Sequence, residues 1–324
     1  MVQVLHQLPK LNNPSLLTGI HSRDDAAVYK LDENTAIVQS VDFFPPNVDD
    51  PFTYGEIAAA NAISDIYAMG GKPIFALNIV SFPDNLPNAI LNDIIAGGSS
   101  KATEAGMLIV GGHTIKNDVP IYGLSVTGTI KPGSEILNSS CQNNDLLLLT
   151  KPIGSGIITT AAKSDAVNKE SLNQCINIMK TLNNKASDAM IKSTINACTD
   201  ITGFGLIGHI LEMTQDSELM ATIKLDNVPI MDNAYEAALA GHVPSGTREN
   251  LRACEKSVEW ASNISLENKL ILCDAQTSGG LVISVSPDNL DNLVNKLKQN
   301  GISDYAIIGE VNLRKDASTQ IIVN

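Results

Sequence analysis

The sequence has few of the residues that define several large classes of protein. Of its 324 residues, 18% are charged and 4% are aromatic, whereas 44% are hydrophobic, which is typical of a folded globular protein. Its five cysteines are odd in number and form no C-x-x-C pair, which argues against zinc and disulfide scaffolds. We therefore expect small buried thiols in a reducing cytosol at Cys141, Cys175, Cys198, Cys254 and Cys273.

Long apolar runs and an excess of basic residues are also absent. No run approaches the roughly 18 apolar residues that cross a membrane, and residues 1–7 lack a signal-peptide pattern. Lys and Arg number 22 against 35 Asp and Glu, a formal net charge of -13, which repels nucleic acid and anionic membranes. We predict a cytoplasmic protein with neither as a partner. Such a chain can still hold a polyphosphate if its carboxylates first recruit Mg²⁺.

Standard nucleotide-binding motifs are missing or poorly placed. The pattern G-x-x-x-x-G-K-[ST] does not occur, so a P-loop is excluded. Residues 203–208 match the dinucleotide fingerprint G-x-G-x-x-G, and Asp226 lies about the right distance beyond it. However, polar residues at 196, 199, 200 and 202 interrupt the approach, where the fingerprint requires a hydrophobic strand. This context disfavours a nicotinamide or flavin enzyme.

Strand-like and helical patterns alternate along the chain, as in α/β folds. A turn-rich stretch over 131–144 lies near the middle and predicts a domain boundary, giving domains 1–141 and 142–324. In the first domain we expect strands at 26–29, 35–41, 74–80, 107–110 and 122–130, and helices at 54–69 and 88–104. In the second we expect strands at 145–150, 280–285 and 305–311, and helices near 171–183 and 210–213.

Several acidic residues lie in or beside apolar segments, where an unpaired charge is costly. Asp42 ends the apolar run 37–41, and Asp200 stands between an apolar run and a glycine-rich turn. Asn61 and Asp65 are four residues apart and share one face of the predicted helix. Each Asp alone is more often an N-cap or turn residue. Together, three or four converging carboxylates favour a site for hard cations such as Mg²⁺, which bridge phosphates.

Two further segments could contribute to such a site. Asp24 and Asp25 immediately precede a predicted strand; adjacent side chains on a strand point to opposite faces, so we expect at most one of them to face a given site. The segment 111–114, Gly-Gly-His-Thr, follows another strand and could bring backbone N–H groups close to phosphate oxygens. By itself a Gly-Gly pair more often marks a simple turn, and a histidine such as His113 is more often structural.

Long runs in both halves of the chain resemble selenophosphate synthetases. The run 57–73 with Asn61 and Asp65 and the run 199–209 are long enough to be specific. Departures inside the motifs are small, as with Ala275 where the family usually has Pro. The matching runs are Arg23–Val28, Val41–Phe44, Ile57–Pro73, Gly111–Thr114, Thr150–Pro152, Thr199–His209, Pro244–Asn250 and Asp274–Gly280.

The resemblance implies a two-domain fold shared with aminoimidazole ribonucleotide synthetase, α/β (α+β), with mixed sheets and helices packed on them. It implies an enzyme that converts ATP, selenide and water to selenophosphate, AMP and phosphate, and homodimers whose partner contributes to a shared nucleotide site. Residues 1–141 would bind ATP and metal and form the dimer. The implied Mg²⁺ ligands are Asp25, Asp65 and Asp200; the implied ATP-binding residues are Ser22, Arg23, Asp24, Asp42 and Asp65, with Gly112, His113 and Thr114 as the partner's segment.

One family feature has no counterpart in this sequence. Family members place a glycine-rich loop, with a Cys or selenocysteine nucleophile and a Lys shortly after it, roughly thirty residues before the Asp pair. Here 23 residues precede Asp24. Lys10 is too close to Asp24 to be the family's Lys, and none of the five cysteines matches the position of the nucleophile. No catalytic residue is therefore assigned within the chain. We hypothesise that a UGA codon for selenocysteine was read as a stop upstream of Met1.

Two alternatives stay open. The first is a non-catalytic ATP-binding regulator of the same fold, which would also retain the aspartates. The second is a superfamily member with another substrate, such as a thiamine-monophosphate kinase or aminoimidazole ribonucleotide synthetase. Turnover of selenide by the full-length protein would separate the first alternative from the enzyme, and phosphorylation of thiamine monophosphate would identify a member of the second group.

Overall fold

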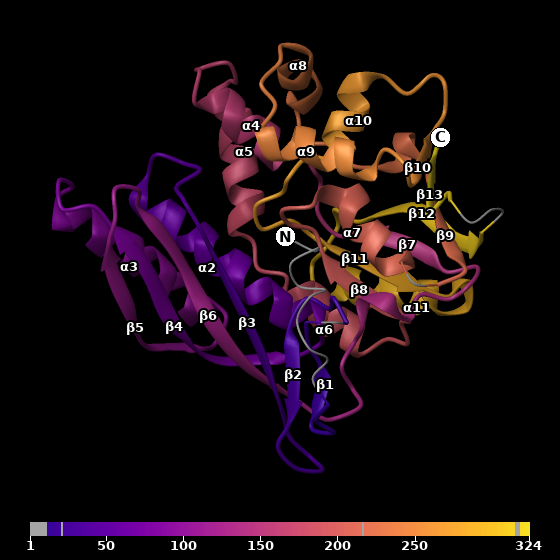
Figure 1. The fold of residues 1–324 in the computed structure, drawn as a ribbon, viewed down its shortest axis with the longest axis horizontal. Coiled ribbons are helices and arrows are strands. Elements are labelled where there is room, and N and C mark those ends of the chain that lie inside the picture. The colour runs from indigo at the N-terminus through magenta and orange to yellow at the C-terminus, as the bar shows by residue number, and fades with distance from the viewer. Residues whose placement is uncertain (1–11, 21, 216, 315–317) are drawn as a thin grey trace.

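Two β-sheets organise the chain, which a computed structural model describes over residues 12–20, 22–215, 217–314 and 318–324 (Figure 1). In the described residues the first sheet has the strand order β1-β2-β3-β6-β4-β5. Its pairings are antiparallel except for β4 with β5. The strands are β1 (Leu16–Thr18), β2 (Ala27–Lys30), β3 (Ala36–Phe44), β4 (Lys72–Phe82), β5 (Leu108–Lys116) and β6 (Ile121–Ile130).

Helices α2 (Pro51–Ala68) and α3 (Asn88–Glu104) cover one face of this sheet (Figure 1). Asp50 begins α2 by accepting a hydrogen bond from the Thr53 backbone N–H at 2.8 Å, as an N-cap residue does. A Cβ at Gly55 or at Gly97 would lie 2.0 Å from a backbone oxygen of the other helix. Glycine at these positions therefore lets the helices approach closely, and their apolar faces form the first core with β3 and β6.

The second sheet has the order β10-β13-β9-β12-β7-β11-β8 in the described residues. Its strands are β7 (Leu146–Leu149), β8 (Ala197–Asp200), β9 (Leu219–Ile223), β10 (Val258–Trp260), β11 (Leu281–Val285), β12 (Ala306–Leu313) and β13 (Ile321–Val323). Its helices are α4 (Ser155–Ala162), α5 (Lys169–Lys180), α6 (Asn184–Ile191), α7 (Gly205–Thr214), α8 (Ala234–Leu239), α9 (Ser245–Cys254), α10 (Leu266–Leu272) and α11 (Pro287–Gln299), with 3₁₀ turns η1 (Asn138–Ser140) and η2 (Leu225–Asn227).

The expected two-domain arrangement of mixed sheets with helices is confirmed, but several local expectations were wrong. Residues 111–114 belong to β5 and pair with β4, because a bulge lets the strand continue through the glycines. Asp42 is not at a strand tip, since β3 runs to Phe44. The short strands β9, β10 and β13 and the amphipathic helix α11 were not predicted. Among the described residues, no helix has both the length and the apolar character needed to cross a membrane.

Candidate active site

A cavity of about 420 Å³ brings together segments that are far apart in the sequence. It is lined by the segment before β2, the middle of β3, the end of β8, and residues of α2 and α7. Five carboxylates face it, and Arg23 is among the residues beside them. The five are Asp24, Asp25, Asp42, Asp65 and Asp200.

Polar neighbours fix two of these carboxylates. The Asn61 side-chain amide donates to Asp42 Oδ2 at 2.8 Å, and Asp65 lies one helical turn further along the same face of α2. The Thr199 hydroxyl donates to Asp25 Oδ1 at 2.8 Å, so it joins β8 of the second domain to the segment before β2. The shared helix face expected for Asn61 and Asp65 is confirmed, and Asp42 lies opposite it.

Asp24 and Asp25 both line the cavity, so the expectation that at most one of them faces the site was wrong. The pair precedes β2, which begins at Ala27, and Arg23 has a left-handed φ of 57°. Strand alternation therefore does not apply to them. Asn138 holds this segment, since its backbone N–H donates to Asp24 Oδ1 at 3.1 Å and its side-chain amide donates to the Arg23 carbonyl at 2.6 Å.

Ser22 is placed beside the cavity wall rather than in it. Its exposed hydroxyl donates to the Gly19 carbonyl at 2.9 Å and accepts from the Gly19 N–H at 3.1 Å, and it also hydrogen-bonds to Asp24. Ser22 therefore shapes the turn that leads into Arg23 and Asp24.

Burial raises the pKa of every carboxyl in the cavity, and repulsion between the carboxylates raises it further for three of them. Burial is the largest cause for each, and the charge of Asp200 adds to it for Asp25, Asp42 and Asp65. The pKa of Asp42 is raised to about 6, while those of Asp25 and Asp65 are raised well above the ordinary value. Clustered like charges are costly unless a cation joins them.

Three of these side chains have an oxygen that no described residue satisfies: Oδ2 of Asp24, of Asp25 and of Asp200 is buried without a hydrogen-bond partner in the described part of the chain. In the described residues no group of three or more His, Cys, Asp or Glu is arranged as a ready-made metal cluster. The donor set is nevertheless all carboxylate oxygen, which is what Mg²⁺ prefers. Unsatisfied oxygens facing a cavity therefore fit a divalent cation that arrives with its own further ligands.

His209 also lines the cavity, although the sequence pattern did not single it out. Its Nε2 accepts a hydrogen bond from the Thr202 N–H at 3.1 Å, and its Nδ1 lies 3.4 Å from a Glu212 carboxylate oxygen. Phe204 packs against its ring at a centroid distance of 5.6 Å. His209 is part of the family-like run 199–209, but only the direction of α7 shows that its ring lines the same cavity as the aspartates.

The structure does not bring Gly112, His113 and Thr114 to this cavity. They lie on the edge strand β5, and Gly112 is aligned with Asp42 through β6 and β4. Three strand spacings separate the two, about 14 Å. All five cysteines are buried, as expected, so none of them faces the cavity as an exposed thiol.

The glycine run 203–208 does lie between a buried strand and a helix, contrary to the expectation of a broken approach. It follows β8 and opens α7. However, β8 pairs antiparallel with β11, its neighbour in the sheet. A dinucleotide fold needs parallel strands joined by the crossover helix, so the fingerprint does not carry its usual meaning here.

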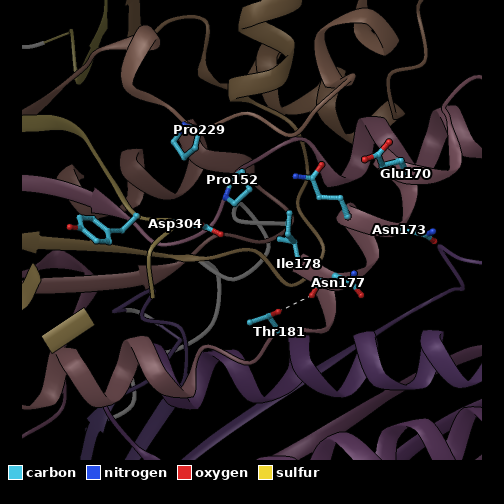
Figure 2. Close-up of a pocket in the computed structure, with 10 residues that line it drawn as sticks. Pro152, Glu170, Asn173, Asn177, Ile178, Thr181, Pro229 and Asp304 are labelled. Atoms are coloured by element: carbon cyan, nitrogen blue, oxygen red, sulfur yellow. Dashed lines mark hydrogen bonds between the residues drawn. The ribbon is translucent and has the colours of Figure 1, made fainter. Parts of the chain in front are cut away.

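A larger cavity of about 940 Å³ lies in the second domain beside α5 (Figure 2). Glu170, Asn173 and Asn177 of that helix line it, together with Pro229 and Asp304. No residue that lines it is among the described ones with a buried, unpartnered polar atom. Its polar groups are spread along the wall, whereas the carboxylate cavity concentrates charge and unsatisfied oxygens. The carboxylate cavity is therefore the candidate active site.

Solved structures share the fold of this chain, and two family models define its class. The chain has a TM-score of 0.70 with the hydrogenase maturation protein HypE in complex with ATP, at 17% identity, covering 96% of this chain and 87% of that one. A thiamine-monophosphate kinase from Stenotrophomonas maltophilia gives 0.69 at 16% identity, covering 100% and 94%. Residues 23–130 match the N-terminal domain of AIR synthase related proteins, and residues 142–322 match the C-terminal domain.

Closer relatives narrow this class. A selenide, water dikinase of Clostridioides difficile (strain 630) is 46% identical over 312 residues, 96% of this chain and 90% of the relative. One from Myxococcus xanthus (strain DK1622) is 45% identical over 97% of this chain and 90% of its own length. Selenide, water dikinase 2 of Peptoclostridium acidaminophilum is 42% identical over 100% and 92%. The chain belongs to the selenide, water dikinase family, and the family resemblance of the sequence is confirmed.

Proposed function

We propose that this protein is a selenophosphate synthetase that converts ATP, selenide and water to selenophosphate, AMP and phosphate. The observation that carries the proposal is the convergence of five carboxylates from both domains on one cavity, with three oxygens left unsatisfied. A site built this way repels free ATP and accepts it together with cations. The relatives named above support selenide as the phosphoryl acceptor.

In this proposal Asp25, Asp65 and Asp200 hold Mg²⁺, because they come from three different segments and lie around the same space. The metal, when bound, neutralises the phosphate charge that the carboxylates would otherwise repel. Arg23 and Asp24 line the cavity next to Asp25, and Asp42 lies across from them, so these three bind the nucleotide with Asp65. Ser22 supports them by fixing the turn.

The protein further acts as a homodimer in which Gly112, His113 and Thr114 of one subunit complete the site of the other. In support, the sheet face away from α2 and α3 carries no helix of the described chain (Figure 1) and exposes large apolar side chains. Phe43 is 53% exposed and Leu108 69%. An open apolar sheet face of this kind needs a partner. Residues 112–114 lie far from the cavity of their own chain, and a second copy of the chain can supply them.

Mixing two inactive variants tests the shared site. In a dimer of Asp65→Ala and His113→Ala subunits, one site carries both substitutions and the other carries neither. If random exchange makes half of the dimers mixed, about 25% of wild-type activity returns. No recovery on mixing, with exchange verified by mass spectrometry, contradicts the shared site. Light scattering gives the oligomeric state of each sample.

Phosphorus NMR tests the reaction itself. The 324-residue chain, and a version extended by the in-frame coding sequence upstream of Met1, are incubated anaerobically with ATP, Mg²⁺ and selenide. We expect the extended version to form selenophosphate and AMP in equal amounts, whereas the 324-residue chain, in which no catalytic residue is assigned, should bind ATP and turn over little. Binding of ATP without turnover by the extended version would favour the nucleotide-binding regulator instead. The compartment that supplies both ATP and reduced selenide, the cytoplasm, is where we place the enzyme.

A further inference from the structure

The loop Gln276–Gly280, between α10 and β11, contacts segments that carry carboxylates of the cavity. The Ser278 N–H donates to Asn61 Oδ1 on α2 at 2.8 Å. The Gly279 N–H donates to the Ile201 carbonyl at 3.1 Å, and the Ile201 N–H donates to the Gly280 carbonyl at 2.8 Å. Ile201 directly follows Asp200. The loop therefore joins the second domain to α2 and braces the end of β8.

Ser278 lies at the centre of this loop in an unfavourable conformation. Its φ is 52°, in the left-handed region that residues with a Cβ rarely adopt, and its buried hydroxyl has no hydrogen-bond partner among the described residues. Nothing about the serine side chain stabilises this backbone. The contacts that do so are on its two backbone groups: Asn61 accepts from its N–H, and Lys151 Nζ donates to its carbonyl at 3.0 Å.

Lys151 is buried with 7% of its surface exposed, and its ammonium also donates to the Thr181 carbonyl at 2.6 Å. Among the described residues it forms no ion pair. An apolar side chain of similar length would fill this place without the cost of burying a charge. The Lys151 side chain instead holds two backbone carbonyls, one of which is that of the strained Ser278.

The contacts continue from Ser278 to the cavity. Because the Ser278 N–H occupies Oδ1 of Asn61, the amide can present only its Nδ2 to Asp42, where it donates at 2.8 Å. We propose that Lys151 and Ser278 are positioning residues, which orient Asn61 and through it Asp42 for binding of the Mg²⁺ complex of ATP. The inference rests on the proposed function for the role of Asp42, while the geometry of the relay does not depend on the phosphoryl acceptor.

Substitution of Lys151 by Met keeps the length of the side chain and removes both hydrogen bonds. We expect the Kd for MgATP, measured by calorimetry, and the KM for ATP to rise about tenfold or more, with a smaller change in the KM for selenide. The matched control is Lys185→Met, at an exposed lysine of α6, which should stay within about twofold of wild type. Lys151→Gln, which keeps an N–H donor, should fall between the two.

A double variant shows whether Lys151 acts through Asn61. If it does, Asn61→Ala combined with Lys151→Met binds MgATP within about twofold of Asn61→Ala alone. A double variant whose increase in Kd equals the product of the increases in the two single variants would overturn the relay. So would a Lys151→Met protein that unfolds at a lower temperature but binds MgATP with wild-type Kd when folded. If Lys151→Met does not fold, Lys151→Gln carries the same comparison.

The wild-type assay keeps this inference separate from the proposed function. An extended wild-type protein that binds MgATP but makes no selenophosphate would contradict the proposed function, and the calorimetric comparison of the variants would still test the relay.

Discussion

Two buried acidic sites in this molecule, the carboxylate cavity and Asp274, differ in whether protein groups satisfy the carboxylate oxygens with hydrogen bonds. Around the cavity, Asp24, Asp25 and Asp200 each leave an oxygen without a partner. Asp274 in the second domain is fully buried, but it accepts from the Thr247 hydroxyl at 2.7 Å, the Ile157 N–H at 3.1 Å and the Gln276 amide at 3.0 Å.

The difference distinguishes a binding carboxylate from a structural one. Three donors from different segments make Asp274 a junction that ties α4 and α9 to the loop after α10. The cavity carboxylates face open space and one another, so their remaining interactions must come from a ligand. Burial raises the pKa in both places, so the pKa alone does not separate them; the satisfied or unsatisfied oxygens do.

Removing a charge from the cavity should have the largest effect on function. We expect Asp65→Asn to lower kcat/KM for ATP by about 1,000-fold or more, because a cation ligand is lost. Without ligands the variant should be as stable as wild type or more so, since burial, and then the charges of Asp200 and Asp42, raise the pKa of Asp65. Phosphorus NMR and thermal unfolding measure the two effects. Activity within threefold of wild type would contradict the assignment of this cavity.

The pH dependence of stability should depend on Asp274. Burial raises its pKa from 3.8 to about 7, so the folded protein binds this proton more tightly than the unfolded chain. Its contribution is therefore fully present below pH 3.8 and is lost as pH rises through about 7, a decrease of up to about 4 kcal/mol.

The substitution Asp274→Asn tests this contribution. It removes the titration and one acceptor, so we expect it to lower the free energy of unfolding by about 1–3 kcal/mol at pH 5. The gap to wild type should narrow toward pH 8, as urea unfolding at both values would show. A gap that stays constant between the two pH values would mean that Asp274 is charged throughout this range.

Stabilisation by MgATP should also differ between variants of the cavity and variants of Asp274. MgATP at about 100 times its Kd should stabilise the wild type by about 2.7 kcal/mol, and a chelator should reverse the gain. Asp274→Asn should show the same gain from its lower starting point, whereas Asp65→Asn should show little. Thermal unfolding with and without MgATP measures each gain. An equal gain in Asp65→Asn would place the nucleotide elsewhere.

The smallest effect is expected at an exposed carboxylate that is already satisfied. Asp50 caps α2, and its hydrogen bonds with the side chain and the backbone N–H of Thr53 lower its pKa. Asp50→Ala should reduce stability by about 1 kcal/mol and leave the Kd for MgATP unchanged. A change in that Kd beyond twofold would show that the start of α2 is coupled to the cavity.

Much of the fold could be predicted because its longest elements have clear periodic patterns. The helix that contains Asn61 and Asp65, and the long strands of the first sheet, were expected close to their observed positions. The three-residue strands β10 and β13 were missed, since such short segments acquire their form from neighbours. The 13-residue helix α11 was also missed, although its amphipathic pattern is present in the sequence. The domain boundary near residue 141 stays a prediction.

The sequence by itself determined the chemistry of this protein: an acidic chain, apolar segments interrupted by aspartates, and family motifs over nearly its whole length. Tertiary structure alone decided which groups meet. It placed both Asp24 and Asp25 in the cavity, added His209, kept Gly112 about 14 Å from Asp42 and linked Lys151 to Asp42 through Ser278 and Asn61. Periodicity fixes the face of one element, whereas contacts between segments depend on how separate elements pack, which no local pattern records.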